Sequence, residues 1–118
     1  MIAVQAVGAP AMVESWRAGR VIVHERMETI ADGIGVRVPI PETLDDLRGL
    51  IDDAVLVGER EIVEGMRLLH RHAGVVAEPS AVVGVAALLQ HGEMFRGRLV
   101  GTIVTGGNLT PDQMRQWL

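Results

Sequence analysis

The chain has 118 residues, 48% of them apolar, so we expect a single domain with its own hydrophobic core over residues 1–118. The net charge of −4 and the lack of any basic run argue against nucleic acid or an anionic membrane surface as a partner, because both attract clustered positive charge. Cysteine is absent and no apolar run approaches the roughly 18 residues that span a bilayer, so we exclude thiolate metal sites and expect a cytoplasmic protein.

Short β-branched runs alternate with amphipathic stretches in the first half of the chain. Pro10 suits the first turn of a helix, and Gly19 suits its end. The stretch from 25 to 41 has no sustained period and is expected to be a loop. The predicted elements are a strand at 2–7, a helix at 10–19, a strand at 21–24 and a helix that begins near 41–43 and continues to 51.

The second half continues the alternation. Gly74 is expected to close the helix at 59–73, and Ser80 is a candidate N-cap. Thr110 and Gln113 match a capping box with proline between them at the first helical position. The predicted elements are strands at 54–58, 75–79 and 98–104, and helices at 59–73, 81–90 and from 111 onward.

This order of elements determines the expected fold class. Continuous apolar strands that alternate with helices are typical of parallel strands joined by crossovers. The sequence therefore predicts an α/β fold, a three-layer parallel sheet with alternating strands and helices. In open sheets of this kind, ligands bind at the carboxyl ends of the strands.

That rule selects a few positions, of which the "TGGN" turn, from Thr105 to Asn108, is the strongest candidate. Glycine lets a backbone approach a planar or phosphorylated ligand closely, and threonine offers a hydroxyl. An ordinary strand-to-helix turn is the alternative. Glu78, in "EPS", ends another predicted strand; its carboxylate either faces a ligand or simply precedes a helix cap.

Other polar groups are better explained by structure than by chemistry. The histidines of "HRH", His70 and His72, lie near a helix C-terminus, where they interact favourably with the helix dipole. Adjacent aspartates at 45–46 and 52–53 fall on or beside an amphipathic helix and are expected on its solvated face. We predict no metal site. Neither a P-loop, nor a nucleophile elbow, nor a dinucleotide fingerprint is present.

Three motifs at family-like spacing resemble one enzyme family: "TIADGIGVRVP", "GVVAEPSAVVGVAALL" and "VGTIVTGGN". They are similar to the C-terminal part of the threonine/serine dehydratases, the threonine ammonia-lyases among the fold-type II pyridoxal-phosphate (PLP) enzymes. The opening "VQAVGAPAMVESWRAGR" resembles the strand and helix that precede the T-x-ADG segment in that family. The resemblance extends along essentially the whole chain.

The resemblance implies part of the large domain of an enzyme that holds PLP between two domains and converts threonine or serine to a 2-oxo acid and ammonia. It implies that Thr105 bonds the pyridine nitrogen of PLP, where serine is usual. Gly106 and Gly107 would let the backbone lie close to the ring. Glu78, and Gly33 in the "ADG" segment, correspond to positions in the pocket wall.

The chain departs from this family at a decisive point, because all eleven basic residues are arginine and the lysine that would carry PLP is missing. No glycine-rich phosphate loop is present, and Ala81 and Val82 stand where relatives carry a small Gly-containing pair. No catalytic residue is therefore assigned. We expect a C-terminal portion that is inactive alone. The alternatives are a non-catalytic module for ligand binding or assembly, or one chain of a split enzyme. We also expect self-association or a companion chain.

Overall fold

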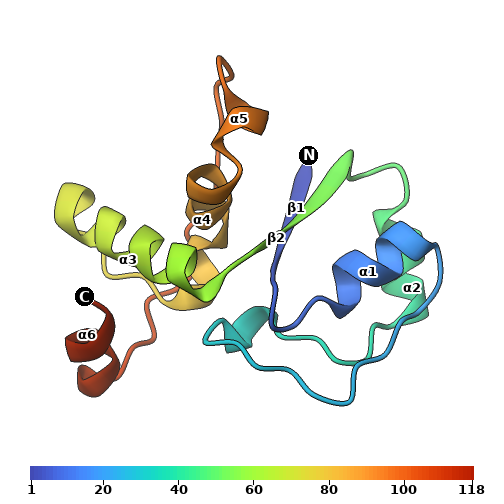
Figure 1. Cartoon of the computed structure of the whole chain (residues 1–118), viewed down its shortest axis with the longest axis horizontal. Helices are drawn as coiled ribbons and strands as arrows, with labels where there is room; N and C mark the ends of the chain where they lie inside the picture. The colour runs from blue at the N-terminus through green and yellow to red at the C-terminus, as the bar shows by residue number, and fades with distance from the viewer.

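The computed structural model describes residues 1–118 and has a two-stranded parallel sheet, β1 (Ile2–Ala6) and β2 (Asp53–Val57), at its centre. The helices are α1 (Ala11–Ala18), α2 (Pro41–Leu47), α3 (Glu59–Ala73), α4 (Val83–Gln90), α5 (Gly92–Phe95) and α6 (Pro111–Trp117), with 3₁₀ turns η1 (Asp32–Ile34) and η2 (Pro79–Val82). In Figure 1, α1 and α2 lie on one side of the sheet, and α3 and α4 lie on the other. The predicted three-layer α/β class with parallel strands is confirmed.

Helices with strong local end signals form where the sequence predicted them. Gly19 ends α1 and Gly74 ends α3, each in the left-handed conformation with φ of 66° and 65°. The capping box of α6 is complete: the Thr110 hydroxyl accepts from the Gln113 backbone N–H at 3.2 Å, and the Gln113 side chain accepts from the Thr110 N–H at 2.9 Å. These ends depend on only a few neighbouring residues.

Two of the predicted strands, at 75–79 and 98–104, were wrong. No backbone hydrogen bond joins these two segments. The bond nearest to doing so runs from the Glu78 N–H to the Gly106 carbonyl at 3.0 Å, and Gly106 lies beyond the end of the segment 98–104. A strand requires a repeating ladder of such bonds with a neighbouring chain. The apolar composition of these segments is typical of strands, but the chain provides no further strand beside them.

The predicted strand at 21–24 was also wrong, for the same reason. Its one backbone contact of this kind is the His24 N–H to the Arg37 carbonyl, at 3.0 Å. The expected loop that follows contains the short turn η1, and α2 ends at Leu47, one turn earlier than the predicted helix. By contrast, β1 and β2 form within one residue of the predicted positions 2–7 and 54–58.

Ser80 is not the N-cap of the helix that follows it. Pro79 begins the 3₁₀ turn η2, so that Ser80 lies inside this turn and the α-helix begins only at Val83. Val82 occupies the N-cap position without a side-chain hydrogen bond. The short helix α5, which the sequence did not predict, follows α4 directly.

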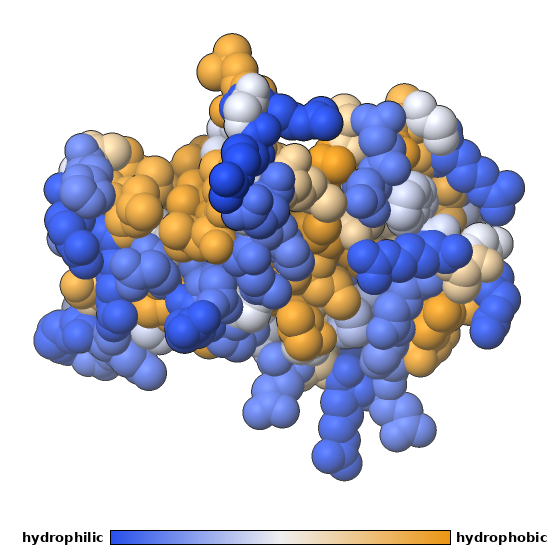
Figure 2. Space-filling model, turned by 45° about the horizontal axis from the view of Figure 1, so that its top comes forward, coloured by the Kyte–Doolittle hydropathy of each residue, from blue (hydrophilic) through white to orange (hydrophobic).

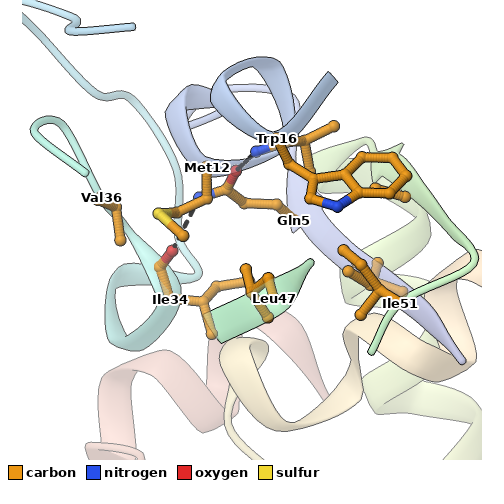
Figure 3. Close-up of a pocket in the computed structure, with 11 residues that line it drawn as sticks. Gln5, Met12, Trp16, Ile34, Val36, Leu47 and Ile51 are labelled. Carbon is orange, nitrogen blue, oxygen red and sulfur yellow. Dashed lines mark hydrogen bonds between the residues drawn. The ribbon is translucent and has the colours of Figure 1, made fainter. Parts of the chain in front are cut away.

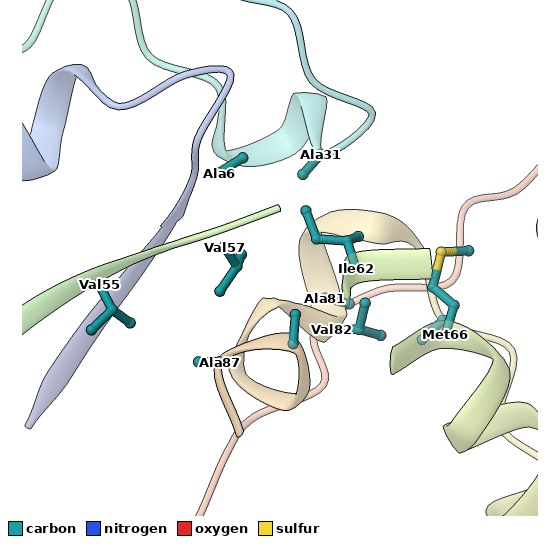
Figure 4. Packing of buried hydrophobic residues seen from close by; sticks show 11 residues of the cluster. Ala6, Ala31, Val55, Val57, Ile62, Met66, Ala81, Val82 and Ala87 are labelled. Carbon is teal, nitrogen blue, oxygen red and sulfur yellow. The ribbon is translucent and has the colours of Figure 1, made fainter. Parts of the chain in front are cut away.

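The hydrophobic core lies between the sheet and the layer of α3 and α4 (Figure 4). Ile62 and Met66, one turn apart on α3, are fully buried in it. All the other members are alanine or valine, in keeping with a chain that has few aromatic residues. The buried cluster consists of Ala6, Ala31, Val55, Val57, Ile62, Met66, Ala77, Ala81, Val82, Ala86 and Ala87.

The molecule is flat and leaves much apolar surface exposed. Its extents are 40 × 36 × 19 Å, and its radius of gyration is 14.5 Å. A chain of this length is expected to have a radius of gyration of about 13.5 Å. Figure 2 shows hydrophobic patches between the charged side chains on the face in view. The segment 98–104 contributes to the exposed apolar surface, because Leu99 is fully exposed and Ile103 is 82% exposed.

Candidate functional site

A cavity of about 440 Å³ lies between β1, the start of α4 and the segment 100–105. This volume falls within the range of about 300–1,000 Å³ that is typical of small-molecule sites. Most of the lining side chains are hydrophobic, and the hydroxyls of Ser80, Thr102 and Thr105 are placed among them. An apolar cavity with a few hydroxyls on its wall is suited to a flat organic ligand that has a small number of polar atoms.

The "TGGN" turn borders this cavity and is attached to Glu78 at two points. The backbone N–H of Glu78 donates to the Gly106 carbonyl at 3.0 Å. The carboxylate of Glu78 accepts, through Oε2, from the backbone N–H of Asn108, also at 3.0 Å. The "EPS" and "TGGN" segments therefore form one unit, although 30 positions separate the bonded residues.

Both glycines of the turn have neighbours that leave no room for a side chain. A Cβ on Gly106 would lie 2.7 Å from Oε1 of Glu78, and a Cβ on Gly107 would lie 2.6 Å from the carbonyl oxygen of Val76. Real Cβ atoms do not approach other atoms so closely. The close approach that requires these glycines is thus to the 76–78 segment of the chain itself.

The "ADG" segment reaches the same region through Ser80. A Cβ on Gly33 would lie 2.9 Å from the hydroxyl oxygen of Ser80, so the two residues are in direct contact. The Ser80 hydroxyl is buried and has no hydrogen-bond partner within the chain. Such a group is unusual in a folded protein.

The structure brings the predicted site residues to one region but gives them different positions. Thr105 lies on the cavity wall. Glu78, Gly106 and Gly107 form the support behind it and do not line the cavity, and Gly33 contacts the lining residue Ser80. The sequence reasoning treated Ser80 only as a helix cap; its place directly after a predicted strand end was the signal that could have singled it out.

A second, smaller cavity of about 190 Å³ lies on the opposite side of the sheet, beneath α1 (Figure 3). Its one polar lining residue is Gln5. The side-chain carbonyl of Gln5 accepts from the Val13 N–H at 3.2 Å, and its amide group donates to the Ile34 carbonyl at 3.4 Å. Because this polar group is already bonded within the chain, the cavity offers a ligand little beyond apolar contact.

Some of the remaining charged groups form ion pairs. His24 lies 2.6 Å from the carboxylate of Glu14, and the amino group of Met1 donates to Asp52, which lowers the pKa of that carboxyl. No cluster of three or more histidine, aspartate or glutamate side chains is arranged to hold a metal ion. None of the helices combines the length and hydrophobicity that crossing a bilayer requires.

Comparison with known proteins identifies the family. The family model described as "Pyridoxal-phosphate dependent enzyme" matches residues 1–106. The chain belongs to this family. Among curated members, it is 38% identical over 109 residues to the L-threonine ammonia-lyase of Thermotoga maritima, in a match that covers 92% of this chain and 27% of that protein.

Two other similar proteins give the same result. The chain is 36% identical over 101 residues to the beta-hydroxyaspartate dehydratase of Paracoccus denitrificans. This match covers 85% of the present chain and 31% of that protein. The structure of maize serine racemase superimposes with a TM-score of 0.84 at 31% identity, covering 98% of this chain and 36% of that one. The predicted resemblance to fold-type II dehydratases is confirmed. The chain spans roughly a third of the length of these relatives.

Proposed function

We propose that this chain contributes the wall that faces the pyridine edge of PLP in an enzyme that eliminates water from threonine or serine. The observation that carries this proposal is Thr105, a hydroxyl residue on the wall of the 440 Å³ cavity. The turn that presents it is attached to the neighbouring "EPS" segment through Glu78. Membership of the PLP-dependent family supports PLP as the ligand.

The chain has residues that suit the pyridine ring of PLP, but it has none whose side chain could attach the coenzyme covalently. The Thr105 hydroxyl would donate to the pyridine nitrogen, and because it is neutral it would leave that nitrogen unprotonated. Ser80 is a second hydroxyl-bearing residue on the same wall. No lysine is present to bind the coenzyme covalently or to move a proton. When bound, PLP supplies the electron sink for the elimination.

We infer that the chain alone does not deaminate threonine or serine. A lysine and a phosphate-binding loop would have to come from outside these 118 residues, and a companion chain that carries them would make this chain one part of a split site. The exposed apolar segment 98–104 favours such an association, because Leu99 and Ile103 lack cover within the chain. Self-association through the same segment is the alternative.

Binding of deoxypyridoxine phosphate, a PLP analogue that lacks the aldehyde, tests the proposal without covalent side reactions. We expect saturable binding in equilibrium dialysis, and a Thr105→Val variant that binds about fivefold more weakly, since one net hydrogen bond contributes about 1 kcal/mol. Thr43→Val, at an exposed position on α2, is the matched control and should bind like the parent chain. A folded parent chain that does not bind, or equal affinities in all three proteins, would contradict the proposal.

A further inference from the structure

We propose that Glu78 is a positioning residue, whose carboxylate fixes the turn from Gly106 to Asn108 and thereby presents Thr105 to the cavity. This inference rests on the proposed function, because it assigns the role to a turn that binds the ligand through Thr105. It differs from the expectation that Glu78 itself forms part of the pocket wall.

Glu78 contacts two residues of the turn, Gly106 and Asn108. Its N–H donates to the Gly106 carbonyl at 3.0 Å, and its carboxylate accepts from the Asn108 N–H at 3.0 Å. The space next to the Cα of Gly106 is occupied by the same carboxylate: the three atoms nearest to a Cβ there are Oε1, Cδ and Oε2 of Glu78, at 2.7, 2.9 and 3.2 Å. Gly107 is held separately, against the backbone of Val76.

The carboxylate has no competing use within the chain. Glu78 is half-buried, is not a member of any ion pair, and does not line the cavity. A hydrogen bond from a backbone N–H to an ionised carboxylate is shorter and stronger than a neutral one. The side chain is therefore placed to hold the turn behind the ligand, and not to touch the ligand.

The two glycines provide an internal comparison. If the Glu78 carboxylate is what excludes a side chain at 106, its removal should reduce the loss of stability and of ligand binding that Gly106→Ala causes. The same removal should not reduce the loss that Gly107→Ala causes. The atom that excludes a side chain at 107 is the Val76 carbonyl oxygen, which would lie 2.6 Å from a Cβ on Gly107. Glu78→Gln keeps an acceptor oxygen and the side-chain shape, so it should preserve the turn.

The test measures hydrogen exchange of the Asn108 amide by NMR, and binding of deoxypyridoxine phosphate, in the 118-residue chain. Glu78→Ala should raise the Asn108 exchange rate at least tenfold and weaken ligand binding, whereas Glu78→Gln should restore both to within about threefold of the parent. Gly106→Ala should weaken binding in the parent chain and have a smaller effect in the Glu78→Ala background. Gly107→Ala should have the same effect in both backgrounds.

An unchanged exchange rate of the Asn108 amide in Glu78→Ala would overturn the inference. So would a result in which Glu78→Ala reduces the effects of Gly106→Ala and Gly107→Ala by the same amount. Circular dichroism checks that each variant is folded. If Glu78→Ala does not fold, the exchange rate of the Asn108 amide in Glu78→Gln tests the inference instead. A tenfold increase in that rate would contradict the role of the acceptor oxygen. If the parent chain does not bind the analogue, the proposed function fails, but the exchange rates and the stabilities of the double variants still decide whether Glu78 positions the turn.

Discussion

The side-chain carbonyl oxygen of Gln5 accepts a hydrogen bond from the backbone N–H of Val13 at 3.2 Å. Val13 is the third residue of α1, and the residue before that helix, Pro10, makes no side-chain cap. A helix leaves its first N–H groups without partners. A buried side chain of β1 thus takes the place of the N-cap, and its amide group also reaches Ile34 (Figure 3).

Replacing Gln5 with methionine should lower the free energy of unfolding by about 1–3 kcal/mol. The new side chain fills a similar space but leaves the N–H of Val13 buried and unbonded. Urea denaturation followed by circular dichroism measures the change. Gln116→Met, at an exposed position of α6, should change the free energy by less than about 0.5 kcal/mol. Equal effects of the two substitutions would show that the Gln5 bond does not stabilise the fold.

Two helical glycines should respond to alanine in opposite directions. A Cβ on Gly65 of α3 would have its nearest neighbours at 3.6 Å, an ordinary contact, so Gly65→Ala should stabilise the chain by about 0.5–1 kcal/mol. A Cβ on Gly84 of α4 would lie 2.0 Å from the Thr102 hydroxyl oxygen, so Gly84→Ala should push the 100–103 segment away and lose stability. Urea denaturation checks both signs. A stabilising Gly84→Ala would mean that this segment is not held against α4.

The contrast between helices and strands shows what could be predicted from sequence. The limits of α3 and the start of α6 were predicted correctly because Gly74 and the Thr110–Gln113 capping box act within one turn. The apolar segment 98–104 was predicted as a strand because of its composition. An apolar composition shows that a segment can form a strand. A strand also needs a neighbouring strand to which its backbone hydrogen-bonds, and no other segment of this chain provides one for 98–104.

The candidate site was predictable only where its signal is local in the sequence. The position of Thr105 after an apolar run pointed to the wall of a site. The pairing of Glu78 with Asn108 could not be read from the sequence, because it joins residues 30 positions apart. The buried hydroxyl of Ser80 was missed because a serine after a strand and before a helix is so often an N-cap.

The exposed segment 98–104 should drive association of the chain. Leu99→Arg together with Ile103→Arg places two charges on this surface, and we expect sedimentation velocity to show a larger fraction of monomer than in the parent chain at the same concentration. Leu50→Arg, at another exposed apolar position, is the control and should leave the distribution unchanged. A parent chain that is monomeric at every concentration would count against association through this segment.

PLP itself should attach covalently to the chain at one place only. With no lysine in the sequence, the amino group of Met1 is the sole primary amine. After incubation with PLP and reduction with borohydride, peptide mapping should therefore find the label on the N-terminal residue alone. Threonine or serine should give no 2-oxo acid in a coupled dehydrogenase assay, because no side chain is present to carry PLP and return the proton. Production of 2-oxo acid that depends on Thr105 would contradict this expectation and would mean that the chain catalyses elimination without the lysine.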